Sequence, residues 1–290
     1  MTLIAQLAVG GVAMGFVYAL LALGIVLLWN AAKVVNFAHG EFLMLGAYVA
    51  AVALGRGWAY PYSLLAVVMV GIILGLGFYW LICRHLRYTE MLAVVVGTVG
   101  LSILLRNSAI VIFGPTPRMV PRMFNKLIVD VAGVRLMTHH LGIIGVAAVL
   151  ITLQYILMYR SPLGAAMRAI ADDRDTARMM GVPVETVTSL VYACSAVLAG
   201  VAGLLSAPLF FASTELGGLL QLKAFAACVL GGFGSIPGAI VGGLALGLLE
   251  VFGVAYISSV YKDVFAFAVL IILLALRPQG FLGERVPIKW

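Results

Sequence analysis

The chain consists of long apolar stretches separated by short polar ones, and this pattern constrains its fold more than any single motif. Hydrophobic residues make up 64% of its 290 residues and charged residues only 10%, whereas about 25% of the residues of a soluble domain are charged. A membrane-spanning helix needs ~20 mostly apolar residues, so the chain has room for about eight such segments. The sequence therefore predicts a single all-α, polytopic membrane domain over residues 1–290.

The apolar runs predict about seven full transmembrane helices. We place them at residues 4–28, 38–54, 62–82, 91–113, 141–159, 186–205 and 263–277. No basic segment precedes the first run, which favours a retained first span over a cleaved signal peptide. The cysteines stand in or beside apolar runs without metal-ligand or CxxC spacing, which predicts buried apolar packing and no metal site.

Residues 219–251 form an apolar stretch that is too long for one straight span. Glycines and a proline interrupt its centre, and irregular backbone inside a membrane is tolerated only where protein or a cavity surrounds it. We therefore expect a re-entrant hairpin of two half-helices whose turn borders the substrate pathway. Two short full spans joined by a tight loop remain the alternative. The predicted pathway residues of the turn are Gly231, Gly232, Phe233, Gly234, Ser235 and Pro237.

The net charge of +7 comes from Lys and Arg that gather in a few polar segments. Such residues are enriched on the cytoplasmic side of membrane proteins, so we assign four segments to that side. The segments contain Lys33; Arg84, His85 and Arg87; Arg160, Arg168, Arg174 and Arg178; and Arg277, Arg285 and Lys289. The span count then places residues 114–140 outside.

The predicted external loop, residues 114–140, is itself basic. Its basic residues are Arg118, Arg122, Lys126 and Arg135. We accept this exception because moving the loop inside would expel the central polar segment, residues 160–183. The residues on either side of Gly133 predict a small β-hairpin formed by Leu127–Val131 and Val134–Met137.

No enzyme active site is readable in the chain. The segment GGFGSIPG lacks the Lys of a phosphate-binding loop, and the adjacent His139 and His140 cannot face one metal from one side of a helix. No Ser/His/Asp or Cys/His nucleophile set is present. The acids near the spans are expected at the membrane interfaces and are Glu41, Glu215, Glu250 and Asp263. We therefore find no ionisable pair that would supply an ion or proton site within the membrane.

The segment NFAHGE is the first polar group of interest, because it stands where one helix ends and another begins. Gly40 permits an unwound turn, and Glu41 is favoured at the positive N-terminal end of the following helix. A broken helix of this kind fits a substrate pathway, whereas a plain cytoplasmic turn between spans is the alternative. The predicted pathway residues are Asn36, Phe37, His39, Gly40 and Glu41.

The central polar segment is the second group, and it is patterned as a short amphipathic helix. Ser161-Pro162 is expected to start it and Gly181-Val182-Pro183 to end it. Its predicted apolar face consists of Ala169, Ile170, Ala177, Met180 and Val182. Three nearby aspartates disfavour an anionic membrane surface, so a docking helix is favoured over a loop that lies on lipid.

Glycines recur at small-xxx-small spacing, which lets helix backbones approach closely. The pairs are Gly11/Gly15, Gly71/Gly75, Gly238/Gly242 and Gly243/Gly247. We expect packing within the chain, with a dimer face as the alternative.

Four segments together resemble one family. They are VVNFAHGEFLMLGAY (34–48), GAAMRAIADDRDTARMMGV (164–182), VLGGFGSIPGAIVGG (229–243) and RPQGFLG (277–283). Over essentially its whole length the chain resembles the permease subunits of ATP-driven branched-chain amino acid importers, specifically the smaller of the two paired permeases. The resemblance implies an inverted-repeat permease in the bacterial inner membrane, without catalytic activity or a bound cofactor of its own.

The resemblance also implies partners: a second homologous permease, two cytoplasmic ATPases that hold ATP and Mg²⁺, and an external substrate-binding protein that docks near residues 114–140. It identifies residues 164–182 with the helix that couples the permease to an ATPase. Ala171-Asp172-Asp173 stands where importers commonly have Glu-Ala-Ala, while Gly181 is kept. The coupling residues that it implies are Arg168, Ala171, Asp172, Asp173, Arg174, Ala177, Arg178, Met180 and Gly181.

The predicted function is therefore import of branched-chain or other hydrophobic amino acids along a path shared with the second permease. A related permease for urea or short amides is the nearest alternative. A self-sufficient secondary carrier or channel is the alternative from another class.

Overall fold

The computed structural model describes residues 2–86, 91–124, 128–131, 134–259, 261–277 and 279–283. Some residues of the sequence predictions lie outside this part of the chain, namely Arg87, Lys126, Leu127, Gly133, Arg285 and Lys289. In chain order the helices are α1 (Thr2–Ala32), α2 (His39–Gly55), α3 (Tyr60–Phe78), a π-helical turn (Tyr79–Cys83), α4 (Arg84–Leu86), α5 (Met91–Phe113), α6 (Thr138–Arg160), α7 (Pro162–Asp172), α8 (Arg174–Met179), α9 (Val184–Phe210), α10 (Leu216–Gly231), α11 (Ile236–Tyr256) and α12 (Lys262–Leu276).

Every predicted span coincides with a helix, but the helices differ in length. Within the described residues, six helices are long and apolar enough to cross a membrane: α1, α3 with its π-helical turn, α5, α6, α9 and α11. Helices α2, α10 and α12 have 17, 16 and 15 residues and fall short of that length. The chain is thus a mostly helical, multi-pass membrane protein. The count of seven full spans and the re-entrant path of residues 219–251 stay predictions.

Helices α7 and α11, which have a proline in the first turn, show how local sequence sets where a helix starts. Pro162 and Pro237 stand in the first turns of α7 and α11, where a backbone N–H has no partner within the helix. The residue before each helix is a serine whose hydroxyl oxygen accepts a hydrogen bond from the N–H of the third helical residue. The pairs are Ser161 with Gly164 and Ser235 with Gly238, each at 3.1 Å. The predicted start of the central segment at Ser161-Pro162 is confirmed.

The chain divides into two compact units, and each is described by itself. Unit 1 consists of residues 1–26, 123–147 and 222–290, and unit 2 consists of residues 27–122 and 148–221. Helices α1, α6 and α10 contribute residues to both units.

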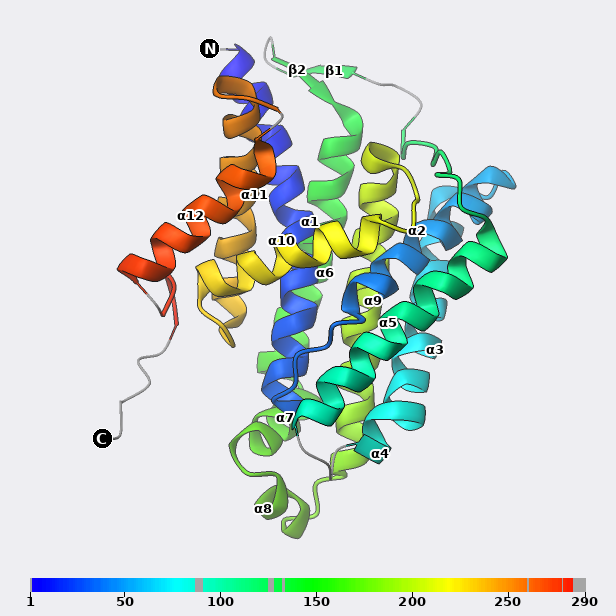
Figure 1. The fold of residues 1–290 in the computed structure, drawn as a ribbon, viewed down its shortest axis with the longest axis vertical. Coiled ribbons are helices and arrows are strands. Elements are labelled where there is room, and N and C mark those ends of the chain that lie inside the picture. Colours follow the sequence, from blue (N-terminus) through cyan, green and yellow to red (C-terminus); the bar gives the residue numbers. More distant parts are fainter. Residues whose placement is uncertain are drawn as a thin grey trace. The chain divides into compact units, whose positions relative to one another are not determined.

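In unit 2, α9 packs against both α2 and α3, and α2 packs against α3 (Figure 1). Glycines bring these backbones together: a Cβ added at Gly46 of α2 would lie 2.2 Å from the carbonyl oxygen of Gly200 in α9. A Cβ at Gly75 of α3 would lie 2.5 Å from the carbonyl oxygen of Tyr192. The contact of Gly75 with α9 fits the predicted close packing within the chain.

Gly46→Ala is therefore expected to destabilise unit 2 by about 1–3 kcal/mol, because backbone atoms of α2 and α9 must separate to admit the methyl group. Gly55→Ala in the same helix is the matched control, since nothing lies within 4 Å of its added Cβ. Thermal unfolding of the two detergent-purified variants measures the difference. Equal melting temperatures would contradict the close approach of α2 and α9.

In unit 1, α1 and α11 approach each other in the same way. A Cβ at Gly15 would lie 2.7 Å from Leu244 Cα, and one at Gly247 would lie 2.3 Å from the backbone nitrogen of Gly15. Helix α11 also packs against α12. The glycine pairs Gly11/Gly15 and Gly243/Gly247, predicted from their spacing, thus face each other within the chain.

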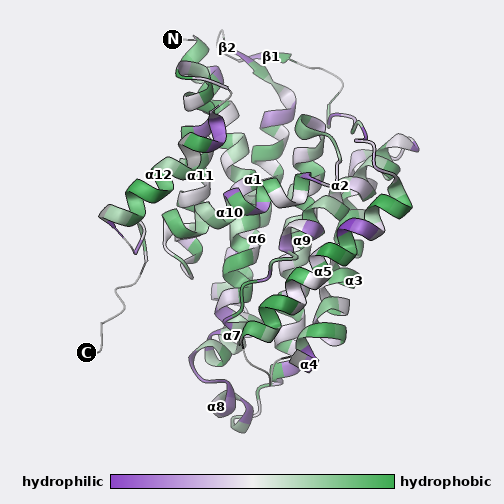
Figure 2. Cartoon of the chain, in the orientation of Figure 1, coloured by the Kyte–Doolittle hydropathy of each residue, from purple (hydrophilic) through white to green (hydrophobic). Residues whose placement is uncertain are grey.

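The predicted β-hairpin in the 114–140 loop is confirmed as strands β1 (Ile128–Val131) and β2 (Val134–Met137) of unit 1. The strands are antiparallel, with Ile128 opposite Met137 and Val131 opposite Val134. Hydropathy colouring shows apolar residues along most of the helices, whereas hydrophilic residues are concentrated on α8 (Figure 2).

Candidate functional site

The turn before α2 is held in shape by side-chain hydrogen bonds within unit 2. Asn36 Oδ1 accepts the N–H of Ala38 at 2.9 Å, which closes a short side-chain turn. Gln221, the last residue of unit 2, forms side-chain hydrogen bonds to both sides of the turn. Its Nε2 donates to the carbonyl oxygen of Asn36 at 3.4 Å, and its Oε1 accepts the N–H of Gly40 at 2.6 Å. The break between helices that NFAHGE predicts is therefore an ordered structure.

Glu41 follows this turn in the first turn of α2 and is bound by one face of α5. Its Oε1 accepts hydrogen bonds from Ser102 Oγ at 2.9 Å and from Arg106 Nη2 at 3.2 Å. One turn before Ser102, Thr98 Oγ1 accepts the N–H of Phe37 at 3.3 Å. Thr98, Ser102 and Arg106 are four residues apart, so they lie on one helix face. This face of α5 therefore contacts the NFAHGE segment at Phe37 and at Glu41.

The three charged side chains around the start of α2 differ in how far they are exposed to solvent. The Glu41 side chain is 2% exposed, that of Arg106 is 35% exposed, and that of Glu215, whose Oε2 lies 4.0 Å from Arg106 Nη1, is 73% exposed. The buried charge of Glu41 is thus compensated by Arg106, which is itself partly exposed to solvent.

The structure contains ion pairs that the sequence analysis did not identify, whereas an ion or proton site within the membrane is not tested by them. Glu41 pairs with Arg106 in unit 2, and Lys223 Nζ lies 2.6 Å from Glu250 Oε1 and 2.9 Å from Asp263 Oδ1 in unit 1. Glu250 is buried on α11. These pairs join residues far apart in the sequence, so spacing alone did not reveal them.

The other predicted pathway residues of this segment have different surroundings. His39 is fully buried, where its Nδ1 lies 3.3 Å from Ser195 Oγ on α9 and its ring stands edge-on to Phe42. Phe37 is 44% exposed. Gly40 meets Gly217 of α10 backbone to backbone, because an added Cβ would lie 2.4 Å from the Gly217 carbonyl oxygen. The pathway role of these residues stays a prediction.

The break predicted at residues 231–237 is present between α10 and α11 in unit 1. Gly232 and Gly234 have φ angles of +106° and +93°, which favour glycine. Gly231 contacts Gly238 so closely that an added Cβ would lie 1.9 Å from the Gly238 carbonyl oxygen. Phe233 and Ser235 are half-buried and Pro237 is exposed. The two arms are unequal, since α11 is long enough for a full span and α10 is not.

The C-terminal motif binds to this break, which sequence reasoning missed. The N–H groups of Phe281 and Leu282 donate to the carbonyl oxygens of Leu230 and Gly231, each at 2.8 Å. They thereby satisfy acceptors that the end of α10 leaves without a partner in the helix. The two motifs around residues 229–243 and 277–283 form one local structure.

The central polar segment is two helices, α7 and α8, rather than the predicted single helix. Asp173 breaks it, with an extended backbone (φ −151°, ψ 113°), and caps α8. Its Oδ1 accepts the N–H groups of Asp175 and Thr176 at 2.9 and 3.1 Å. The hydrogen bonds from Thr176 and Asp175 lower the pKa of Asp173. The cap is therefore present above the usual Asp pKa and is lost only as the pH falls through the lowered value.

The predicted end of the segment at Gly181 is confirmed, because Gly181 has a φ of +82° and donates its N–H to the carbonyl of Arg178. The predicted apolar face is not continuous. Ile170 and Ala177 are buried within unit 2, whereas Met180 and its neighbour Met179 are each 80% exposed.

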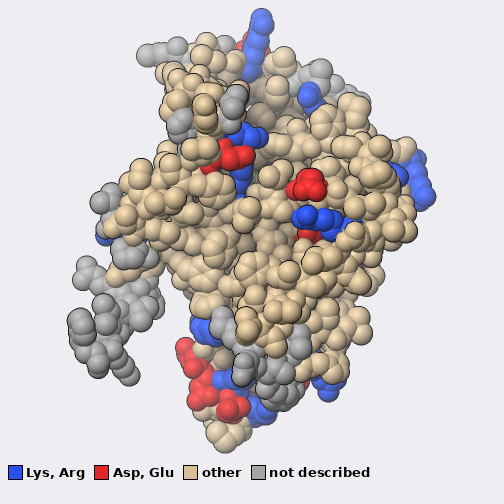
Figure 3. Space-filling view, viewed as in Figure 1, with Lys and Arg blue, Asp and Glu red and all other residues tan. Residues whose placement is uncertain are grey.

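The charged residues of the segment are mostly exposed. Asp172, Asp173 and Arg178 face solvent, and Arg174 and Ala171 are half-buried. Arg168 Nη1 donates to the carbonyl oxygen of Met158, which ties α7 to the end of α6. Charges of both signs gather over α7 and α8, whereas most of the rest of the visible surface is uncharged (Figure 3).

The two ends of α9 carry different segments. At its start, Glu185 accepts hydrogen bonds from Tyr79 Oη at 2.5 Å and from Arg178 Nη2 at 3.1 Å, so α8 and the end of α3 meet there. Beyond its other end, Ala212 and Arg118 exchange two backbone hydrogen bonds of 2.9 Å. Because α9 has 27 residues and rises ~1.5 Å per residue, about 40 Å separate its ends. The central polar segment and residues 114–118 thus lie at opposite ends of unit 2.

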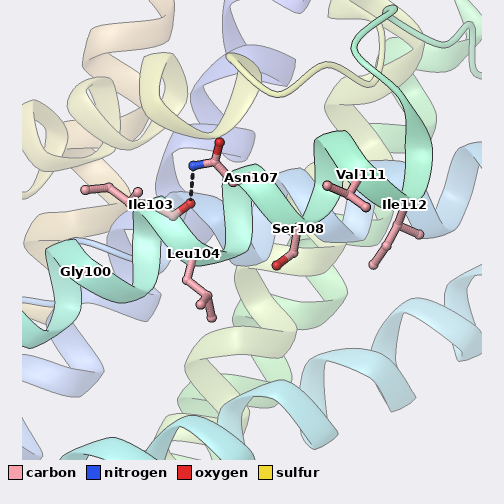
Figure 4. A pocket seen from close by; sticks show the side chains of 7 residues that line it. All are labelled: Gly100, Ile103, Leu104, Asn107, Ser108, Val111 and Ile112. Carbon is pink, nitrogen blue, oxygen red and sulfur yellow. Dashed lines mark hydrogen bonds between the residues drawn. The ribbon is translucent and has the colours of Figure 1, made fainter.

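The outer side of α5 carries an open hollow of about 670 Å³ whose lining residues all come from that helix (Figure 4). Its lining is mostly apolar, and the Asn107 side chain donates back to the carbonyl oxygen of Ile103 at 2.8 Å. The residues that line it carry no charged side chain. In the described part of the chain, no three His, Cys, Asp or Glu side chains are grouped as metal ligands.

Comparison with known proteins assigns the family. Residues 7–274 match the model of the branched-chain amino acid transport system permease component. This chain belongs to that family. The high-affinity branched-chain amino acid transport system permease protein LivH of Salmonella typhimurium is 35% identical to this permease over 94% of both chains. LivH of Escherichia coli K12 matches to the same extent, and BraD of Pseudomonas aeruginosa is 33% identical over 96% of this permease and 95% of BraD.

A solved structure, PsaBC from Streptococcus pneumoniae in complex with Fab, is similar in fold to this permease. The TM-score is 0.52 at 14% identity, over 95% of this permease and 92% of that chain. The permease relatives indicate a multi-pass membrane transport protein, and the solved structure supports the fold.

Proposed function

We propose that this chain is the transmembrane subunit of an ATP-driven importer of branched-chain or other hydrophobic amino acids. The observation that carries the proposal is the near full-length similarity to permeases named for branched-chain amino acid transport. The chain does no covalent chemistry and binds no cofactor, because ATP and Mg²⁺ would be held by two partner ATPases. A second homologous permease would complete the translocation path.

The substrate path runs along NFAHGE and the polar face of α5, where Glu41, Arg106 and Glu215 lie together. This placement is supported by the charges, since ionisable groups among spans are costly and usually mark substrate or ion pathways. For unit 1 taken by itself, we propose that the turn at residues 231–237 borders a substrate pathway. Its glycines and the tail that caps α10 give it a defined backbone at a helix break.

The central polar segment is the docking site for an ATPase, and residues 114–140 face the external substrate-binding protein. Helix α9 supports both assignments. The central polar segment contacts the start of α9 through Arg178 and Glu185, and Arg118 of the 114–140 loop pairs with Ala212 beyond its end. The permease lies in the bacterial inner membrane with α7 and α8 in the cytoplasm.

This orientation predicts opposite labelling of two matched methionines. Met180 and Met119 are both 80% exposed, and they stand near opposite ends of α9. In a background without Cys83, Cys194 and Cys228, we expect Met119→Cys to react with a membrane-impermeant thiol reagent in intact cells and Met180→Cys to react only after lysis. Labelling of Met180→Cys in intact cells would overturn the orientation.

The function is tested by purification in mild detergent and by reconstitution. We expect two ATPases and a second permease to co-purify, and the reconstituted complex with its binding protein to import radiolabelled leucine only when ATP is supplied. Leucine uptake without ATP would support a secondary carrier. Uptake of urea or a short amide in place of leucine would assign the complex to that branch.

A further inference from the structure

Three polar atoms around the start of α2 have no hydrogen-bond partner among the described residues, although all three are buried. They are the Oε2 of Glu41, the Nε of Arg106 and the Nδ2 of Asn36. A buried polar group without a partner costs free energy and calls for an explanation, such as a bound ligand. The first atom is an anionic acceptor and the other two are donors, one of them cationic.

The three atoms belong to one connected structure. Arg106 and Ser102 hold the other oxygen of Glu41, and Gln221 joins Asn36 to the start of the same helix. Glu215 adds a second carboxylate within 4.0 Å of Arg106. Carboxylate acceptors for a cation therefore lie 3.2 and 4.0 Å from the guanidinium donors of Arg106, which can bind an anion.

An α-amino acid has the complementary arrangement, because its ammonium and carboxylate groups are attached to one carbon atom. We propose that Arg106 and Asn36 bind the carboxylate of a zwitterionic amino acid and that Glu41 binds its ammonium group, with Glu215 at the entrance. This inference rests on the proposed function and adds the part of the substrate that the permease recognises. It makes Arg106 a specificity-determining residue.

The solvent exposure of the three charged side chains suggests the order in which they meet the substrate. Arg106 and Glu215 are the accessible members, and Glu41 lies behind them. When the substrate carboxylate binds the guanidinium of Arg106, its ammonium replaces Arg106 as the partner of Glu41. Each charge keeps an opposite charge beside it throughout the exchange, which avoids the cost of leaving a buried charge uncompensated. A neutral amide cannot make this exchange, so the site favours amino acids over urea.

The test uses Arg106→Met, Glu41→Gln, the double variant and a control, Ser108→Ala, on the same helix but in the hollow. Each is purified with its partner subunits and reconstituted. We expect leucine uptake to fall by about 10-fold or more in both single variants, because each loses a charged hydrogen bond to the substrate. Ser108→Ala is expected to transport like wild type.

The double variant separates recognition from a structural role. It removes both charges, so a pair that only stabilises the fold would be dispensable and uptake would return to the wild-type level. We expect assembly and thermal stability to recover while leucine uptake stays low and ATP hydrolysis persists. Full recovery of uptake would overturn the proposal. A wild-type complex that hydrolyses ATP but never imports leucine would instead refute the proposed function, since no variant is involved.

Discussion

Lys223→Met is expected to destabilise unit 1 by about 3–5 kcal/mol, the cost of removing one partner from a buried ion pair. Lys223 and Glu250 are both more than nine-tenths buried, and Lys223 Nζ lies 2.6 Å from Glu250 Oε1. The substitution keeps the length of the side chain but leaves the carboxylate of Glu250, among the described residues, with the Tyr18 hydroxyl alone, which donates to its Oε2 at 2.5 Å. The side chain of Asp263, the other partner of Lys223, is 45% exposed, although its Oδ1 atom, which faces Lys223, is buried.

The matched variant is Lys223→Met combined with Glu250→Gln. It removes both buried charges and keeps an oxygen that can accept the hydrogen bond from Tyr18, so most of the lost stability should return. Thermal unfolding of the detergent-purified proteins measures both effects, with the fraction of monodisperse protein as a second readout. If the double variant melts no higher than Lys223→Met, charge compensation is not what Lys223 provides.

Much of the fold could be predicted because it follows from local patterns. Apolar runs located the helices, turn residues located the β-hairpin, and Ser161 and Gly181 marked the ends of the central segment. Glycine spacing identified close helix packing, although it did not say that Gly15 meets Gly247. Such partners depend on the topology of the chain, which a single sequence does not contain.

The candidate site was only partly predictable. NFAHGE was found because a polar segment between spans is visible in the sequence, whereas Arg106 was overlooked inside an apolar helix. An isolated charge within a span is itself a signal of function, so Arg106 and Lys223 could have been noticed without their partners. The pairing of the C-terminal tail with the end of α10 had no such signal, since it rests on backbone hydrogen bonds.

The break at Asp173 was missed because the amphipathic pattern of the segment was given more weight than the tendency of aspartate to start a helix. Residues 164–180 have an amphipathic pattern, which predicts one helix. Aspartate is also a preferred N-cap residue, and Asp173 uses its side chain to start α8. The extended backbone of Asp173 gives α8, which ends at Met179, a direction different from that of a continuous helix.

The combined substitution of Met179 and Met180 by aspartate is expected to abolish ATP-dependent uptake by releasing the ATPase. Both methionines are 80% exposed at the end of α8, so they are available to a partner and add little to the fold. Burial of a methionine side chain contributes about 1.5–3 kcal/mol, so loss of the pair weakens docking by ~100-fold or more. Aspartate in their place would also bring uncompensated charge into the contact.

The matched control is Met119→Asp, which changes an equally exposed methionine near the other end of α9. Co-purification of the ATPases measures docking, and leucine uptake measures coupling. We expect the Met179/Met180 variant to lose both while the second permease remains bound, because α7 and the start of α9 are unaltered. Met119→Asp should keep the ATPases, since the proposed orientation places Met119 on the opposite side of the membrane from them. If the Met179/Met180 variant retains the ATPases, docking rests on the charged residues of α7 and α8 instead. If Met119→Asp loses the ATPases, the assignment of the two ends of α9 is reversed.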